Sequence, residues 1–221
     1  KIKESTFAAK NIIVICVTGI SFLLCIYAVR HLPPIDFRAY KIGTHIPSAM
    51  QAKESPKFQY TFEKNGEKLK SFDYKSEEDG YKLVGHAVIN EEASTPKITD
   101  FATWNESGDK TDMVLSGKKL WIVAYDISNS NTEGLIDVND LISRLSPGIE
   151  PIILTSSSAE DVLQVRARRG MKTDFYYADA TVLKTIIRSN PGLLLVEDGT
   201  VKAKWHFNDV PDPIDITEKL K

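Results

Sequence analysis

The chain has 221 residues, of which 42% are hydrophobic and 26% are charged, and its formal net charge is −2 at pH 7. This composition is typical of a globular protein and supplies enough apolar side chains for a core without disulfide or metal cross-links. Because the charges are nearly balanced, the chain has no global basic field, which argues against nucleic acid as a partner.

The first element along the chain is an uncharged segment from Asn11 to Val29. A helix of this length extends roughly 28 Å, which matches the hydrocarbon thickness of a bilayer. We therefore predict a transmembrane helix with its flank over residues 1–31, stopped by the two prolines that follow Leu32. A cleaved signal peptide is the alternative, but the apolar run is long for one and Ile26-Tyr27-Ala28 is a poor cleavage site. Basic residues flank both ends, so charge does not determine the orientation.

The two cysteines of the chain, Cys16 and Cys25, both lie inside this segment. On a helix they are on the order of 13 Å apart along the axis and on opposite sides, so they cannot form a disulfide with each other. We expect them to face lipid or pack against neighbouring helices. The chain starts at Lys1 rather than Met, and we expect it to be a piece of a longer polypeptide with room for further membrane helices upstream.

Residues 32–96 are predicted to form a linker with a β-hairpin extension. The segments Lys57–Phe62 and Lys68–Tyr74 flank Asn65-Gly66, a dipeptide that favours a tight hairpin turn. Alternation places the aromatic side chains of the first segment on one face. A further strand is expected over Tyr81–Ile89, followed by a polar connector over Glu91–Pro96.

Residues 97–221 alternate strands with helices, an order typical of an α/β sheet with right-handed crossovers. The strands are predicted at 98–104, 120–125, 151–155, 174–177, 193–196 and 201–205, the last two forming a hairpin. The helices are predicted at 135–145, from Ser157 onward and at 180–188.

This order, with Gly117-Lys118-Lys119 before the central strand and the run from Asn190 to Gly199 near the end, resembles the periplasmic thioredoxin-like domains of the TlpA type. The resemblance covers roughly the last 125 residues. It implies an α/β, thioredoxin-like domain over 97–221, tethered to one transmembrane helix. It also implies a cis peptide bond before Pro191, facing the turn that carries the redox cysteines in such domains.

That turn contains no cysteine in this chain. A thiol-disulfide catalyst of this type needs two thiols at Cys-x-x-Cys spacing next to a helix N-terminus, whereas residues 126–132 read Asp-Ile-Ser-Asn-Ser-Asn-Thr. We therefore predict no catalytic residue and lean against an enzyme. What remains is a candidate partner groove, which we assign to Asp126, Ser128, Asn129, Asn190 and Pro191.

A second resemblance concerns the membrane part. Thr6–Asn11 entering the apolar segment, followed by Ile35–Gly43, is similar to the last helix and exit segment of bacterial DoxX-like membrane proteins, which are related to the MauE family. It implies the bacterial inner membrane, with the soluble domain in the periplasm. It also implies contacts with membrane lipid and with other membrane helices or envelope proteins.

No other motif indicates chemistry. The four histidines, His31, His45, His86 and His206, lack metal-ligand spacing and are expected at the surface or in interfaces, so we predict no metal and no cofactor. Ser156-Ser157-Ser158 is interpreted as a strand-to-helix loop with a cap, and the arginines at 166–169 as a solvated helix end.

Three functions are compatible with these observations. The first is a membrane-anchored, redox-inactive interaction or assembly module of a DoxX-like envelope protein. The second is the substrate-holding part of a periplasmic thiol-disulfide relay, whose cysteines lie upstream or in a partner. The third is an accessory subunit of a large envelope membrane complex, which would present an apolar contact on the span or on the Phe58/Tyr60/Phe62 face.

Overall fold

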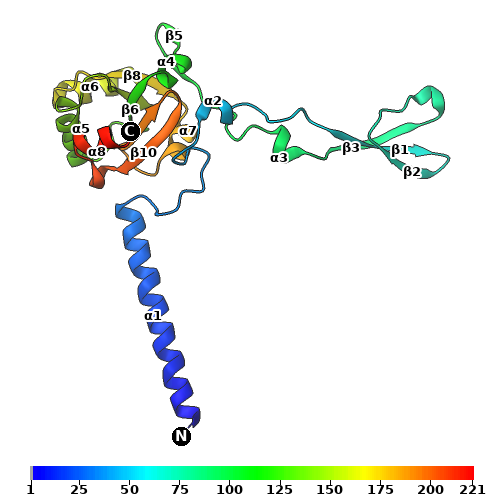
Figure 1. Ribbon diagram of the computed structural model, residues 1–221, viewed down its shortest axis with the longest axis horizontal. Coiled ribbons are helices and arrows are strands. Elements are labelled where there is room, and N and C mark those ends of the chain that lie inside the picture. Colours follow the sequence, from blue (N-terminus) through cyan, green and yellow to red (C-terminus); the bar gives the residue numbers. More distant parts are fainter. Residues whose placement is uncertain (1) are drawn as a thin grey trace. The chain divides into compact units, whose positions relative to one another are not determined.

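The computed structural model describes residues 2–221, with side chains from Lys10 onward, and divides the chain into two compact units (Figure 1). The main unit consists of the residues up to Thr44 together with Phe101–Lys221. The hairpin unit consists of His45–Asp100. The predicted linker region, residues 32–96, is thereby divided, because residues 32–44 belong to the main unit.

Helix α1 (Ile2–Arg30) contains the predicted apolar segment. Its part from Lys10 to Arg30, 21 residues, is long and apolar enough to cross a membrane. Large apolar side chains along it, such as Phe22, are exposed, and Cys16 and Cys25 are free and exposed. The predicted helix is confirmed.

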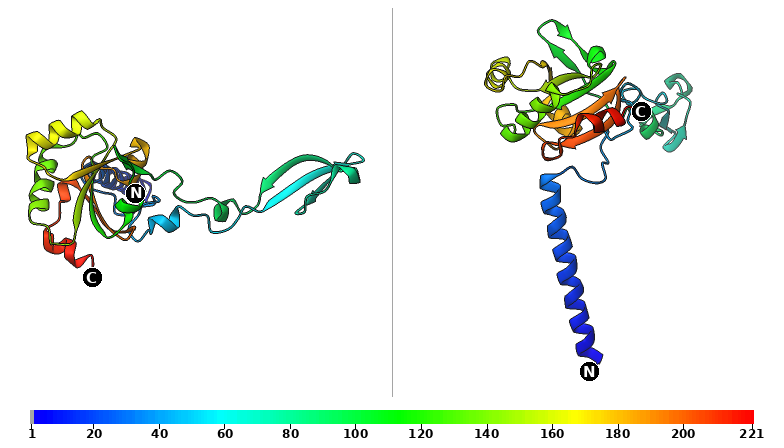
Figure 2. Two further views of the ribbon diagram at one scale, coloured as in Figure 1. Left: turned by 90° about the horizontal axis from the view of Figure 1, so that it is seen from above. Right: turned by 60° about the vertical axis from the view of Figure 1, so that its left-hand side comes forward.

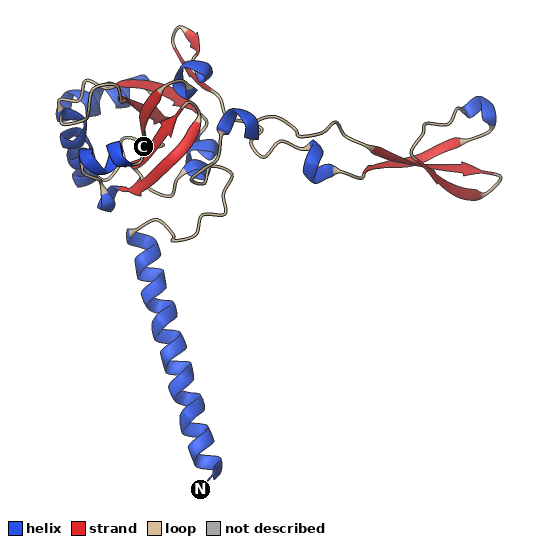
Figure 3. Cartoon of the chain, viewed as in Figure 1, coloured by secondary structure: helices blue, strands red, loops and turns tan. Residues whose placement is uncertain are grey.

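The main unit is built on a seven-stranded sheet with the order β10-β9-β6-β7-β8-β4-β5. The bounds are β4 Thr103–Asn105, β5 Gly108–Asp109, β6 Lys118–Val123, β7 Glu150–Thr155, β8 Asp174–Ala178, β9 Gly192–Glu197 and β10 Thr200–His206. Strands β6, β7 and β8 run parallel, while β9 pairs antiparallel with both β6 and β10. Parallel pairs require crossover connections, and the ribbon views show helices packed beside the sheet (Figures 2 and 3).

Helices of the main unit cover the sheet and complete the core. Besides α1 they are α4 Thr111–Leu115, α5 Thr132–Ser143, α6 Ala159–Arg169, α7 Ala180–Ile186, the 3-10 turn η2 Phe207–Asp209 and α8 Pro213–Glu218. On one face, Leu120 and Ile122 of β6 pack with Val138 of α5, Val162 of α6 and Ile216 of α8. This face buries the apolar stripes of three helices, which is the main source of stability for such a layer.

The boundaries differ from the sequence-based prediction in places. The strand predicted at 98–104 is wrong over its first part, because only Thr103 and Trp104 of that range join β4. Ile98 and Phe101 are buried without pairing in a strand, so their apolar character reflects packing. Helix α5 begins three residues before Leu135, because the Asn131 side chain accepts a hydrogen bond from the Gly134 N–H and caps it.

The hairpin unit contains a three-stranded antiparallel sheet with the order β2-β1-β3. Its elements are α2 Ile46–Ala49, β1 Phe58–Lys64, β2 Glu67–Ser71, η1 Glu77–Asp79, β3 Lys82–Val88 and α3 Glu91–Ser94. Asn65 and Gly66 both have positive φ, 54° and 83°, so the predicted hairpin turn is confirmed. The predicted polar connector at 91–96 contains the single turn α3.

Aromatic side chains of the hairpin pack against one another within the hairpin unit. Phe62 is fully buried, with Tyr74 and Tyr81 in edge contact at ring-centroid distances of 5.8 and 6.0 Å. Lys64 and Lys75 lie over the Tyr81 ring. These contacts form a small core that the alternation of β1 alone does not reveal.

Candidate functional site

The candidate site lies where the central strand β6 leads into helix α5. Residues 126–131 form the connecting loop, and its own side chains fix its shape. The Asp126 carboxylate accepts hydrogen bonds from the backbone N–H and the side-chain amide of Asn129, at 3.1 and 2.9 Å. The Ile127 N–H donates to the hydroxyl of Ser157 on the next strand-to-helix connection. The loop is therefore held on both sides.

Asn190 and Pro191 face this loop, as predicted. The Asn190–Pro191 peptide bond is cis. The Asn190 side chain donates to the Asp126 carbonyl at 2.7 Å and accepts from the Ser130 hydroxyl at 3.0 Å. The Asn190 carbonyl accepts from the Asn131 N–H at 2.8 Å. The structure thus brings together all five residues of the predicted groove.

These contacts limit what the site can do. An extended peptide is bound in such grooves through backbone hydrogen bonds, but the Asn190 carbonyl already has its partner in Asn131. Pro191 and Ser130 are buried. The exposed polar groups of the loop are those of Ser128 and Asn129. The surface offered to a partner is therefore the outer rim of the loop.

The loop also lacks the chemistry of a redox turn. Disulfide exchange requires a thiolate that attacks a sulfur and a second sulfur that resolves the mixed disulfide. Residues 126–132 contain hydroxyl, amide and carboxylate groups and no sulfur, and both cysteines of the chain lie on α1. These residues can form hydrogen bonds but cannot take up or release the electrons of a disulfide.

The serine cluster that follows β7 has a structural role, as predicted. Ser158 caps α6, where its hydroxyl accepts from the Asp161 N–H and donates to the Asp161 carboxylate. The bond from Ser158 lowers the pKa of Asp161. Ser157 supports the candidate loop, and Ser156 donates to the Tyr125 carbonyl. Among the residues whose side chains the structure describes, no histidine or lysine is hydrogen-bonded to any of the three to act as a base.

The expectation that all four histidines lie at the surface or in interfaces is wrong for His206, which is 4% exposed. Burial lowers the pKa of His206, and its Nδ1 accepts a hydrogen bond from the Asn208 N–H. His206 thus serves as a cap of η2 and packs on Phe207. Within the described residues, no group of three potential metal-ligating side chains occurs.

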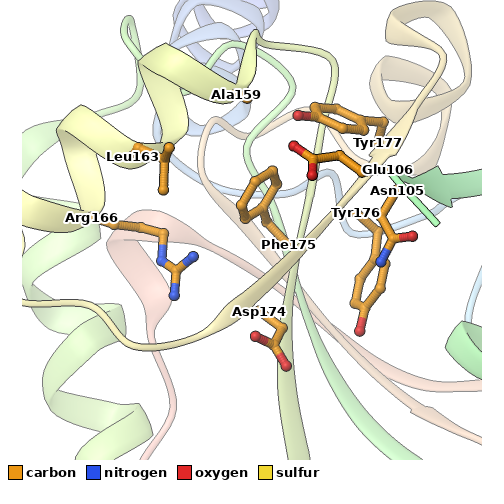
Figure 4. Close-up of a pocket in the computed structure, with 9 residues that line it drawn as sticks. All are labelled: Asn105, Glu106, Ala159, Leu163, Arg166, Asp174, Phe175, Tyr176 and Tyr177. Carbon is orange, nitrogen blue, oxygen red and sulfur yellow. The ribbon is translucent and has the colours of Figure 1, made fainter.

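A cavity of about 380 Å³ lies between α6, β8 and the β4–β5 turn (Figure 4). Arg166 and Leu163 come from α6, and Phe175 forms part of the opposite wall. The Arg166 guanidinium already donates to the Met171 carbonyl and lies over the Phe175 ring at 5.7 Å. Because the lining contains no nucleophile paired with a base, the cavity gives no indication of catalysis.

The structure also reveals a buried ion pair that the sequence analysis missed. Lys204 of β10 is 3% exposed, and its Nζ contacts the Asp36 carboxylate at 2.8 Å. The same Nζ donates to the carbonyls of Tyr40 and Ile186. Asp36 also accepts from Arg38 at 2.8 Å. The pair joins the exit segment of α1 to the sheet, and its only sequence signal was a lysine among apolar strand residues.

Comparison with known proteins gives structural likenesses alone. No family model matches the chain, and no curated protein matches its sequence. Among solved structures, a thiol peroxidase from Chromobacterium violaceum is 14% identical, with a TM-score of 0.40 over 56% of this chain and 83% of that one. A putative thioredoxin from Neisseria meningitidis is 15% identical, with a TM-score of 0.38 over 55% and 85%. A secreted Mycobacterium tuberculosis disulfide oxidoreductase homologous to E. coli DsbE is 11% identical, with a TM-score of 0.37 over 55% and 94%.

These identities and TM-scores carry no conclusion about activity. The topology itself defines the fold: a parallel β6-β7 pair, an antiparallel β9-β10 hairpin beside β6, and a cis proline just before β9 facing the β6–α5 loop. The main unit is thioredoxin-like. The predicted α/β fold class is confirmed.

Proposed function

We propose that this chain is the last helix and the soluble domain of a DoxX-like protein of the bacterial inner membrane. Helix α1 crosses the membrane, and the thioredoxin-like main unit lies in the periplasm as a redox-inactive interaction or assembly module. The observation that carries the proposal is the loop at 126–131, which has the position of a redox turn, contains no thiol and is closed against Asn190.

The partners we propose are membrane lipid around α1, other membrane helices, and envelope proteins that contact the rim of the loop. The exposed apolar side chains of α1 support the first two, since such side chains are stable only in lipid or against another apolar surface. Ser128 and Asn129 are the groups available to an envelope protein. The substrate-holding role in a relay receives less support, because Asn131 already takes one of the two acceptor positions of the Asn190 carbonyl.

The redox part of the proposal is tested by insulin reduction with the full chain in detergent micelles and dithiothreitol as the electron source. We expect the uncatalysed rate, because residues 126–132 contain no sulfur. The variant C16S/C25S, which has no thiol, is the matched control. A rate above that of C16S/C25S would contradict the proposal.

The location is tested by protease treatment of spheroplasts from cells that express the chain. Cleavage within residues 39–221 is expected, since periplasmic segments are accessible in spheroplasts. Full protection of this region would exclude the proposed orientation.

The interaction role is tested by site-specific photo-crosslinking in cells. A photoreactive residue in place of Ser128 is expected to give a discrete adduct with an envelope protein. Lys172, exposed before β8, is the control position, because it lies at the end of the parallel strands opposite to the loop. Identical adduct patterns at both positions would show that the rim has no specific partner.

A further inference from the structure

Three apolar side chains are strongly exposed directly after α1. Ile35 is 64% exposed, Phe37 is 89% exposed and Ile42 is 58% exposed. Two of them, Ile35 and Ile42, line a cavity of about 340 Å³ together with Leu32, Pro33, Pro34, Asp36, Arg38, Lys41 and Lys204. A soluble domain rarely leaves such a group in water without a partner.

This segment is fixed to the folded main unit and is not a free tether. Asp36, next to Phe37, is held by Lys204, whose Nζ has three acceptors. Beyond it, the Gly43 N–H donates to the Val201 carbonyl, and the Val201 N–H donates to the Thr44 carbonyl. The three apolar side chains are therefore presented by a folded surface, anchored at both ends to β10.

The short length of chain between the end of α1 and these apolar side chains indicates what covers them. Phe37 lies seven positions after Arg30, the last residue of α1, and a stretch of this length reaches at most about 25 Å when fully extended. Two consecutive prolines lie within this stretch and restrict its backbone conformations, because each fixes its own φ. A surface tied this closely to a membrane-length helix lies at the bilayer interface, where aromatic and aliphatic side chains are favoured next to basic ones. Lys41, exposed in the same segment, supplies a cation.

We propose that Ile35, Phe37 and Ile42 form a lipid-contact patch that inserts into the interfacial zone of the bilayer that α1 crosses. The patch, together with the Asp36–Lys204 pair, holds the main unit against the membrane surface. This inference rests on the proposed membrane anchoring of α1. It identifies membrane lipid as the occupant of the patch.

The test measures the depth of spin labels in the full chain, reconstituted in vesicles of phosphatidylethanolamine and phosphatidylglycerol. In a C16A/C25A background, single cysteines replace Phe37, Ile42, Ile20 of α1, or Ile136 of α5. Ile136 is the matched control, an aliphatic residue that is 49% exposed on helix α5 of the main unit. Collision with oxygen reports lipid, and collision with a water-soluble nickel complex reports water.

We expect the ratio of oxygen to nickel collisions at positions 37 and 42 to exceed that at 136 several-fold. Adding F37S to the variant labelled at 42 is expected to lower its ratio, because the patch inserts as one surface. A label at 20 in lipid with labels at 37 and 42 in water overturns this inference and leaves the anchoring intact. Labels at 37 and 42 shielded from both reagents indicate a protein partner and also overturn it. A label at 20 in water overturns the anchoring itself.

Discussion

At the scale of single residues, the ion pair between Asp36 and Lys204 combines burial with complete hydrogen bonding. Burial alone raises the pKa of Asp36, but the hydrogen bonds from Lys204 and Arg38 outweigh it and hold that pKa at about 2. Burial lowers the pKa of Lys204, and the bond to Asp36 offsets part of this. Three acceptors around Nζ require three N–H donors, so Lys204 is charged. The lowered pKa of Asp36 stabilises the folded chain at neutral pH, whereas the lowered pKa of Lys204 destabilises it, because burial of the ammonium is a cost.

Replacing Lys204 with Met is expected to destabilise the main unit by about 3 kcal/mol, the lower end of the cost of breaking a buried ion pair, because Arg38 still contacts Asp36. The measurement is urea unfolding of the full chain in micelles, followed by tryptophan fluorescence. The matched control is K202M on the same strand, whose partly exposed pair with Glu197 should be worth less than about 1 kcal/mol. Equal losses in the two variants would contradict the role assigned to Lys204.

Acid should weaken the main unit through Asp36. Its pKa is about 2 in the folded chain against 3.8 ordinarily, so the unfolded chain binds a proton more readily. The stabilisation is therefore complete above about pH 4 and is lost as the pH falls through about 2, by on the order of 2 kcal/mol. Unfolding free energies of the wild type and D36N, measured between pH 5 and 2, check this. D36N should show the smaller decrease with falling pH, and parallel curves would exclude Asp36 as the titrating group.

Asn190 is the residue that closes the candidate loop. Replacing it with Ala removes the side-chain bonds to Asp126 and Ser130, and we expect a loss of about 1 to 2 kcal/mol. Hydrogen exchange of the Asn131 amide should become faster, because the loop loses its lateral support. N129A, which removes one exposed side-chain hydrogen bond to Asp126 in the same loop, is the control and should cost less than N190A.

At the scale of elements, helix α5 depends on close packing against η2. Gly134 is buried in the first turn of α5, and a Cβ built on it would lie 2.6 Å from the Phe207 Cβ. No rotation of the Phe207 side chain relieves that contact, because Cβ is fixed by the backbone. The glycine therefore allows α5 and η2 to approach each other, at some cost in helix propensity.

G134A is consequently expected to destabilise the main unit by about 1 to 2 kcal/mol, because overpacking outweighs the helix propensity gained, about 1 kcal/mol. Thermal unfolding followed by tryptophan fluorescence measures this. D137A, at an exposed position of the same helix, should leave stability unchanged within about 0.5 kcal/mol. If G134A were stabilising, as propensity alone predicts, the close packing would not be present in solution.

At the scale of the whole molecule, the chain consists of two units with separate apolar cores. The core of the hairpin unit centres on Phe62, and that of the main unit on the buried faces of β6 and β9. All three tryptophans, Trp104, Trp121 and Trp205, belong to the main unit. Tryptophan fluorescence therefore reports the main unit alone.

F62A should unfold the hairpin unit selectively, since loss of a fully buried Phe costs about 3 to 5 kcal/mol, more than a small sheet can supply. Hydrogen exchange of β1–β3 amides should become fast, while the fluorescence-detected unfolding of the main unit stays unchanged. T61A, on the opposite face of β1, is the control. A shift of the tryptophan transition in F62A would show that the two units unfold together.

The sequence by itself determined the features that depend on neighbouring residues or on composition. These are the apolar helix before Arg30, the hairpin turn at Asn65-Gly66, the cap at Ser158 and the absence of sulfur from the loop at 126–132. Periodicity, turn conformation and capping act over a few residues, so they can be read along the chain. The resemblance to thioredoxin-like domains then predicted the cis bond before Pro191.

Only the tertiary structure decided the contacts between distant residues. Asp36 and Lys204 are separated by 168 positions, and Asp126 and Asn190 by 64. Their pairing depends on which strands become neighbours in the sheet, and no local pattern encodes it. The same holds for His206, buried by the packing of η2, and for Ile98, whose apolar side chain suggested a strand but fills a core. Burial is a property of the assembled layers, and the apolar or polar character of a residue does not specify it.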